Sequence, residues 1–295
     1  MGRKGLERVV SDLGPVDPGH AGEAAWLRRW RLRPDGDPIT TASSTLMPVR
    51  TTEGVGARAM LKLAHTEEEV RGADLLAALD GHGAARVLQR NGTAMLLERA
   101  TGGRDLVRMA EGGEDDEATR IICDAADRIH AASDAVLGSD DPPELVDLPT
   151  WFRRLFSEAD RLAPFHRRGA EVAEALLDDP RDLVVLHGDL HHGNVLDFGE
   201  RGWLAIDPKG LLGEAAFDYC NLLCNPSHEH ALEPGRLERQ FGVVVAATGL
   251  EPARLRDWLV AWCALSSTWF VLDDAPRLAE SAAAIGERAL ALASR

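Results

Sequence analysis

Apolar positions in the first third of the chain come in short runs separated by turn residues, a pattern typical of β-strands. Residues 39–47 and 57–63 are two such runs. The connector between them, residues 50–56, is rich in Thr, Glu and Gly and predicts the turn of a β-hairpin. Two further runs, residues 85–89 and 93–97, predict two more strands in the same region.

Beyond residue 100 the apolar positions recur mainly at helical spacing, apart from a polar, proline-containing connector at residues 138–149. We therefore predict an N-terminal β-rich lobe (residues 1–99) and a mainly helical C-terminal lobe (residues 100–295). The predicted helices of the second lobe cover residues 117–132, 151–177 (one long helix or two), 214–223, 235–248, 251–272 and 275–293.

The stretch at residues 183–208 interrupts the helical pattern and reads LVVLHGDLHHGNVLDFGERGWLAIDP. Its two apolar runs predict short strands that bring Asp189, Asn194 and Asp207 to one edge. A hydroxyl that attacks a nucleoside triphosphate needs a carboxylate to orient it and take its proton, and the accompanying Mg²⁺ needs hard oxygen ligands. Asp189 fits the first role, and Asn194 with Asp207 fits the second.

The spacing of these three residues matches the catalytic loop of kinases, in which an Asp is followed five positions later by an Asn and, after a hairpin, by a metal-binding Asp. The alternative is a polar hairpin whose Asp and Asn residues only form turns, and it does not explain three such groups in this register. A zinc site is not predicted, because Gly188 and Gly193 break any helix that would bring the neighbouring histidines to one face. We expect His187 to brace the loop instead.

With its HGD and IDP triplets, the stretch from His187 to Glu214 resembles the aminoglycoside phosphotransferases, and within them the streptomycin 6-phosphotransferase and hydroxyurea phosphotransferase branch. The resemblance extends from about residue 40 to about residue 264. It implies an α+β, two-lobed fold of the protein-kinase type, with residues 1–99 as the nucleotide-binding lobe, residues 100–295 as the catalytic and substrate lobe, and the active site between the lobes. It also implies that the γ-phosphoryl group of ATP is transferred, with Mg²⁺, to a hydroxyl of a small molecule.

The resemblance makes Lys62, a single cation inside an apolar strand, the residue that binds the α- and β-phosphates of ATP. A lysine at a strand edge with its ammonium in water is the alternative. A helix is predicted to begin at Thr66, and an acid of its first turn would hold Lys62 extended. Of the candidates Glu67, Glu68 and Glu69, the resemblance favours Glu69, and the other two are expected to be solvated helix-start acids.

Other nucleotide contacts are expected from loops and main-chain groups. Neither GxxxxGK[ST] nor GxGxxG occurs in the sequence, so the turn at residues 40–45, with Ser43 and Ser44, is expected to cover the phosphates. A plain Ser/Thr-rich turn is the alternative. The strand that ends near residue 97 would lead into the hinge of a kinase fold, where main-chain groups bind adenine. The hinge candidates are Leu97, Glu98 and Arg99.

The chain has 295 residues, of which 45% are hydrophobic, and this is enough for two lobes with substantial cores. Its 33 basic and 48 acidic residues give a formal net charge of −15. This charge argues against nucleic acid and anionic membranes as partners and suits a cationic small-molecule substrate. The acids expected to meet such a substrate in the second lobe are Glu214, Asp218, Asp273 and Asp274.

Four further features of the sequence bear on the prediction. The acidic segment at residues 111–117 is expected to be a solvated loop and helix start, and Lys209 either adds positive charge near the phosphates or faces solvent. The four cysteines show no CxxC spacing and are expected to be small buried residues in a reducing compartment. No stretch has the length of a signal peptide core or a membrane span, so we expect a cytoplasmic protein.

The sequence thus predicts an ATP- and Mg²⁺-dependent kinase that phosphorylates an aminoglycoside antibiotic, with a streptomycin-type acceptor favoured. One alternative is a kinase for hydroxyurea or another small metabolite. A second is a nucleotide-binding pseudokinase that serves as an interaction module, which would be expected to lack one of the four residues Lys62, Asp189, Asn194 and Asp207. The acceptor hydroxyl and the oligomeric state are not predicted.

Overall fold

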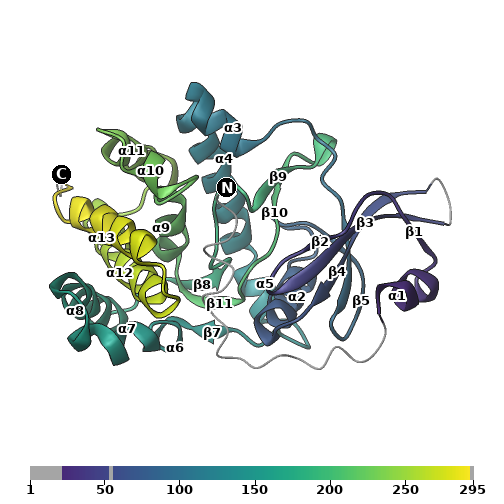
Figure 1. Cartoon of the computed structure of the whole chain (residues 1–295), viewed down its shortest axis with the longest axis horizontal. Helices are drawn as coiled ribbons and strands as arrows, with labels where there is room; N and C mark the ends of the chain where they lie inside the picture. Colours follow the sequence, from purple (N-terminus) through teal and green to yellow (C-terminus); the bar gives the residue numbers. More distant parts are fainter. Residues whose placement is uncertain (1–21, 53–55, 293–295) are drawn as a thin grey trace.

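The computed structural model describes residues 22–52 and 56–292 and consists of a β-rich lobe beside a mainly helical lobe (Figure 1). The first lobe is built on an antiparallel sheet in the order β1-β3-β4-β6-β5, with β2 paired to β3. Its elements are α1 (Glu23–Arg29), β1 (Leu32–Pro34), β2 (Ile39–Thr40), β3 (Ser44–Thr51), β4 (Arg58–Ala64), α2 (Glu67–Leu79), β5 (Val87–Asn91) and β6 (Ala94–Glu98).

The sheet buries both of its faces, as the alternation along β6 shows. Leu96 packs in a cluster with Trp26 and Trp30 at α1, whereas Met95 and Leu97 belong to the large core that includes α2. Successive side chains of a strand point to opposite faces, so one strand contributes to two cores. Helix α2 is therefore held against the face of the sheet from which the active site is built.

The predicted hairpin is present as β3 and β4, paired from Ser44 with Ala64 to Arg50 with Arg58. The apolar run at residues 39–47 is divided, because the chain turns at Thr41. The hydroxyl of Thr41 accepts hydrogen bonds from the backbone N–H groups of Ser43 and Ser44, which ends β2 and starts β3. The side chain of Thr66 caps α2 as predicted, since it accepts from the N–H of Glu69.

The second lobe contains most of the helices. Its α-helices are α3 (Leu106–Met109), α4 (Asp115–Ala131), α5 (Ser133–Leu137), α6 (Leu148–Trp151), α7 (Arg153–Glu158), α8 (Pro164–Asp178), α9 (Asp218–Leu223), α10 (His228–Ala231), α11 (Arg236–Thr248), α12 (Pro252–Leu272) and α13 (Pro276–Leu290). A π-helical turn, Ala110–Glu114, joins α3 to α4. Its strands are β7 (Val146–Asp147), β8 (Leu183–Leu186), β9 (Val195–Asp197), β10 (Trp203–Ala205) and β11 (Leu211–Glu214).

Two predicted helices differ from those observed. The helix predicted at residues 151–177 is broken into pieces, and α8 starts anew at Pro164, which suits the first helical turn but not a helix interior. The helix predicted at residues 214–223 begins only at Asp218, because Glu214 still pairs with Leu183 as the last residue of β11. The two strands predicted in residues 183–208 are present as β8 and β10, and the structure adds a third, β9, which pairs with β10.

Helix α12 is the centre of the helical lobe and is apolar on nearly all sides. Trp258 and Trp262 are both buried and pack edge-on against Phe217, so this tryptophan pair belongs to the core and not to a pocket wall. Helix α13 lies beside α12 at the end of the molecule away from the sheet (Figure 1). Among the helices at residues 22–52 and 56–292, none has the length and apolar character needed to cross a membrane.

The two lobes are also joined by backbone hydrogen bonds. The N–H of Ala85, just before β5, donates to the carbonyl of Ala205 at the end of β10, and the N–H of Ala205 donates to the carbonyl of Gly83. Asp207 follows β10 by two residues. The bridge therefore fixes the start of the Asp207 segment relative to the sheet that carries Lys62.

Candidate active site

The loop between β8 and β9 carries Asp189 and Asn194, and buried hydrogen bonds hold it at its start. The carboxylate of Asp218, at the start of α9, accepts from the backbone N–H groups of His187 (2.8 Å) and Gly188 (2.7 Å). His187 is buried and neutral, with Nε2 donating to the carbonyl of Ile206 (2.8 Å) and Nδ1 accepting from the N–H of Asp189. Burial lowers the pKa of this histidine and favours the neutral form.

The carboxylate of Asp189 points into a set of polar groups. Asn221, one turn further along α9 than Asp218, donates from Nδ2 to Asp189 Oδ1 at 2.8 Å. Asn194 donates to the Asp189 carbonyl at 2.9 Å and lies 3.4 Å from Oδ2, while Lys209 Nζ lies 3.6 Å from Oδ2. The Asp189 side chain is 15% exposed, so it is held firmly but is still accessible to a substrate.

Lys62 bridges the two lobes. Its ammonium contacts Glu69 of α2 and Asp207 of the second lobe, and the Lys62 and Glu69 side chains are buried. Although burial alone would lower it, these two carboxylates raise the pKa of Lys62. Ser43 donates to Glu69 Oε1 at 2.7 Å, so the turn at residues 40–45 is tied to the lysine through this glutamate. Ser44 is buried within the turn.

Asp207 adopts a left-handed backbone conformation (φ 65°), which is uncommon for a residue other than glycine and often marks a functional position. Although burial would raise it, Lys62 and Lys209 hold the pKa of the Asp207 carboxyl below its usual range. The backbone connects Asp207 to Asn194, because the N–H of Ile206 donates to the Asn194 carbonyl. A carboxylate and an amide oxygen from these two residues are the hard ligands that suit Mg²⁺ beside a nucleotide.

Helix α2 lies directly on the segment that follows Asp207. A Cβ on Gly72 would overlap the carbonyl oxygen of Pro208, so the helix approaches the chain here as only glycine permits. Lys209 is on this segment and is neither exposed nor unpaired. Its ammonium lies 3.3 Å from Glu68 of α2. Glu68 was expected to be solvated, and the structure corrects this, because its side chain is buried against Lys209.

The hinge candidates follow β6. Leu97 is buried, and the N–H of Glu98 donates to the Arg86 carbonyl at 3.0 Å, so it is not available to adenine. The Glu98 carboxylate accepts from Arg201, and the Arg99 guanidinium contacts Asp35. The side chains of Glu98 and Arg99 therefore stabilise the structure around the hinge.

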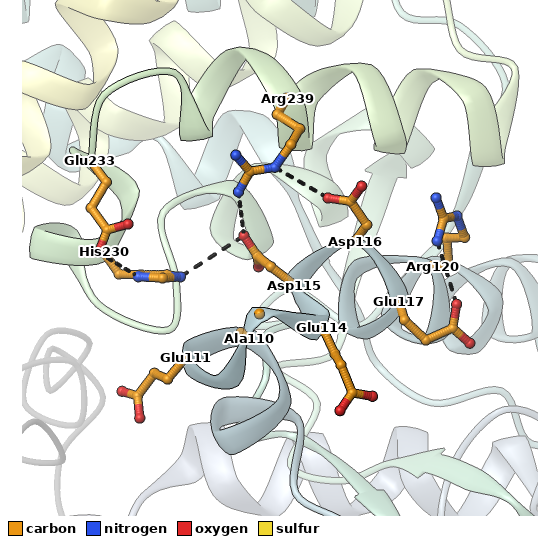
Figure 2. Close-up of a pocket in the computed structure, with 11 residues that line it drawn as sticks. Ala110, Glu111, Glu114, Asp115, Asp116, Glu117, Arg120, His230, Glu233 and Arg239 are labelled. Carbon is orange, nitrogen blue, oxygen red and sulfur yellow. Dashed lines mark hydrogen bonds and ion pairs between the residues drawn. The ribbon is translucent and has the colours of Figure 1, made fainter.

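An acidic pocket of about 510 Å³ lies between the start of α4 and the α10–α11 region (Figure 2). The segment at residues 111–117 forms one wall, but Asp115 is buried and not solvated as expected. It accepts from Arg236 at 2.8 and 2.9 Å, and Arg239 and His230 lie within 4 Å. The pocket is lined by Ala110, Glu111, Gly113, Glu114, Asp115, Asp116, Glu117, Arg120, His230, Glu233 and Arg239.

The catalytic loop carries a buried histidine, His192, which lies between Asp189 and Asn194 in sequence. His192 is buried, and neither of its ring nitrogens has a hydrogen-bond partner among the described residues. Burial lowers the pKa of His192 to about 3, and the charges of Arg236, His191 and His230 add to this effect. His192 is therefore a neutral side chain within the loop that carries Asp189.

The four acids expected to meet the substrate lie outside the acidic pocket. Both oxygens of Glu214 accept from Arg254, at 2.7 to 3.1 Å, and the side chain is buried. Asp218 is buried under the catalytic loop. Asp273 and Asp274 are exposed at the end of α12 and do not line the acidic pocket. The structure thus corrects the prediction for Glu214 and Asp218, whose contacts are structural.

Sequence reasoning missed Asn221 and the supporting role of Asp218, and it left Lys209 open between positive charge near the phosphates and exposure to solvent. Asp218 and Asn221 are three residues apart on a helix, which places them on the same face, and this spacing was the available signal. The packing of α9 under β8 decides which loop these two residues face, and local sequence patterns do not predict that packing.

The model of one protein family, described as aminoglycoside/hydroxyurea antibiotic resistance kinase, matches residues 29–274. The chain belongs to this family. It is 49% identical over 255 residues to a streptomycin 3''-kinase from Klebsiella pneumoniae, covering 84% of this chain and 91% of that protein. It is 30% identical to a streptomycin 6-kinase from Streptomyces griseus (90% and 87% covered) and to a hydroxyurea phosphotransferase from Kitasatospora aureofaciens (92% and 78%).

Solved structures of other kinases share the fold. One is the aminoglycoside phosphotransferase APH(4)-Ia in ternary complex with ADP and hygromycin B, with a TM-score of 0.65 at 12% identity, covering 92% of this chain and 98% of that one. Another is a choline kinase from Cryptosporidium parvum, with a TM-score of 0.56 at 13% identity, covering 86% and 87%. The predicted two-lobed protein-kinase-like fold and the predicted family are thus confirmed, and the chain is a phosphotransferase.

Proposed function

We propose that this kinase transfers the γ-phosphoryl group of ATP, with Mg²⁺, to a hydroxyl of a streptomycin-type aminoglycoside. The observation that carries the proposal is the placement of the Asp189 carboxylate. One oxygen is fixed by Asn221, and the other lies beside Asn194 and Lys209. A fixed, accessible carboxylate next to cations and oxygen ligands is what an attacking hydroxyl requires.

Each residue of the site then has a role. Asp189 orients the acceptor hydroxyl and takes its proton as the oxygen attacks the γ-phosphorus. Lys62, held by Glu69, binds the α- and β-phosphates, and Ser43 with Ser44 covers them. Asp207 and Asn194 would hold Mg²⁺, which neutralises the phosphate charge when bound. Positioning and charge neutralisation supply most of the rate.

The acceptor is proposed from three observations. The relative with 49% identity is a streptomycin 3''-kinase, which favours the 3''-hydroxyl over the 6-hydroxyl. The acidic pocket carries six carboxylates against the two arginines Arg120 and Arg239, so its negative charge suits the guanidinium and ammonium groups of a streptomycin-type polycation. The net charge of −15 would help to attract such a substrate. Main-chain groups near Leu97, Glu98 and Arg99 are proposed to contact the nucleobase, except the Glu98 N–H, which donates to the Arg86 carbonyl.

An assay of ADP release by the purified full chain, with streptomycin, hydroxyurea or a neutral sugar as acceptor, tests the function. We expect turnover with streptomycin. The Asp189→Asn variant should lose roughly 10²-fold or more in kcat, with little change in Mg·ATP affinity. Turnover with hydroxyurea alone would favour the hydroxyurea kinase instead, and binding of nucleotide without any turnover would favour the pseudokinase. Near-normal turnover by the variant would remove Asp189 from the mechanism.

A further inference from the structure

The chain contains two lysine–glutamate pairs that use adjacent residues of α2. Glu69 holds Lys62 from the N-terminal lobe, and Glu68 holds Lys209 from the segment after Asp207. Only the first pair has a role in the proposed mechanism. The Lys209 ammonium lies 3.3 Å from Glu68 Oε1 and 3.6 Å from Asp189 Oδ2, so it is between α2 and the carboxylate that meets the acceptor.

The backbone of Lys209 and the base of its side chain are held in place. Its backbone N–H donates to the carbonyl of His187 at 2.7 Å, and its own carbonyl accepts from Arg71 Nε at 3.3 Å. Its side-chain stem lies against Gly188, where a Cβ would come within 3.1 Å of the Lys209 Cβ. The side chain is only 16% exposed. The ammonium is thus directed at the catalytic loop by the backbone and by packing.

Stability alone does not account for this arrangement. A buried ion pair gains little over apolar packing, because both ions lose their hydration. Glu68 Oε2 has no hydrogen-bond partner among the described residues, so the pair is not optimised as a closed unit. The Lys209 ammonium has the Glu68 carboxylate on one side and the Asp189 carboxylate on the other, at 3.3 and 3.6 Å. Lys209 is therefore a cation at the point where more negative charge must arrive.

We propose that Lys209 is a catalytic residue whose ammonium binds the oxygens of the phosphoryl group during its transfer, and that Glu68 positions it. This inference rests on the proposed function. The acceptor oxygen must come within about 2.6–3.2 Å of the Asp189 carboxylate, and the phosphorus within about 3–3.5 Å of that oxygen. An ammonium 3.6 Å from the same carboxylate, on a flexible four-carbon stem, reaches the phosphoryl oxygens with a small shift.

In this step the acceptor oxygen forms a bond to the γ-phosphorus, and the bond from that phosphorus to the β,γ-bridging oxygen breaks. ADP leaves with the electron pair of the broken bond, and the hydroxyl proton goes to Asp189. The charge of the transferring group spreads over its three equatorial oxygens, where a second lysine stabilises it. Lys62 does not serve there, because it is assigned to the α- and β-phosphates.

The rival explanation is that Lys209 only ties α2 to the catalytic loop. The two explanations predict different losses of ligand affinity when the ammonium is removed. If Lys209 only holds α2 against the catalytic loop, its loss would disturb the whole cleft and weaken Mg·ATP and Mg·ADP binding together with activity. A contact with the transferring group would affect only species that resemble that group, such as Mg·ADP with aluminium fluoride, whose planar fluoride mimics the phosphoryl group in transit.

The experiment compares Lys209→Met, Lys209→Arg and Glu68→Gln with the wild type, and Glu67→Gln, an exposed acid on the same helix turn, is the matched control. For Lys209→Met we expect kcat with streptomycin to fall about 10²- to 10³-fold, as for loss of one transition-state donor, while the Kd for Mg·ATP changes less than about threefold. Aluminium fluoride should no longer tighten Mg·ADP binding. Lys209→Arg should recover part of both signals, Glu68→Gln should lose part of both, and Glu67→Gln should match the wild type.

The proposal is overturned if folded Lys209→Met keeps a kcat near that of the wild type, or if its Kd for Mg·ATP rises as much as kcat falls. If Lys209→Met does not fold, Lys209→Arg and Glu68→Gln decide in the same way, since both keep buried polar groups. The aluminium fluoride titration needs no acceptor. The titration therefore still tests the role of Lys209 if the acceptor is not streptomycin. Failure of the wild type to bind Mg·ATP would instead refute the proposed function.

Discussion

Removal of the Asn221 carboxamide should uncouple the Asp189 carboxylate from α9. Asn221 is buried, and its Nδ2 donates to Asp189 Oδ1 at 2.8 Å. A hydrogen bond to a charged group contributes about 1.5–3 kcal/mol. If that energy serves to hold the base in its reactive orientation, Asn221→Ala should lower kcat by between about tenfold and about 150-fold, since about 1.4 kcal/mol corresponds to a factor of ten.

The assay is steady-state ADP release with saturating Mg·ATP and streptomycin, together with calorimetric titration of Mg·ATP. Nucleotide affinity should stay within about twofold, because the contacts of Asn221 are to Asp189 and Asn225, and neither is a proposed nucleotide ligand. Asn91→Ala, which truncates an exposed asparagine at the end of β5, is the control and should behave as the wild type. A kcat within twofold of wild type in Asn221→Ala would refute the reasoning that this contact orients the base.

Three further predictions concern the metal ligand, the acceptor and a histidine far from the site. Asp207→Ala should abolish Mg²⁺-dependent ATP binding in a calorimetric titration, and wild-type affinity would contradict its role. The kcat/KM for streptomycin should fall as salt is raised past physiological strength, because the Debye length is about 8 Å there and shortens further. The kcat/KM for a neutral acceptor should change little. Burial lowers the pKa of His166, so below about pH 6.5 the unfolded chain binds a proton that the native state does not bind. The free energy of unfolding should therefore decrease as the pH is lowered, by up to about 1.4 kcal/mol per pH unit. The His166→Gln variant should show a smaller slope in chemical denaturation.

Local sequence signals predicted much of the fold and the central residues of the site. Thr66 as a helix cap, the hairpin around residues 50–56 and the spacing of Asp189 to Asn194 depend on neighbours in the chain, so pattern reasoning reaches them. Ser43 was predicted only as part of a phosphate loop. Its contact with Glu69 depends on a helix 26 residues away in sequence.

The errors share one physical cause, which is that the partner of a charged group is set by tertiary packing. Glu214 reads as a free acid near a pocket, yet Arg254, 40 residues away, takes both of its oxygens. Glu68 reads as a solvated helix-start acid, but the close approach of α2 to Pro208, permitted by Gly72, buries it against Lys209. A net charge or a helix position does not reveal such pairings.

The most direct test of the account is the structure of the reaction product. Purified protein would be incubated with Mg·ATP and streptomycin, and the product examined by phosphorus–proton correlation NMR. We predict one new phosphate ester, with the phosphorus coupled to the proton at C3'', formed together with one equivalent of ADP and absent when Asp189→Asn is used for the same time. No ester on streptomycin would contradict the proposed function, and coupling to the proton at C6 would contradict the assigned position.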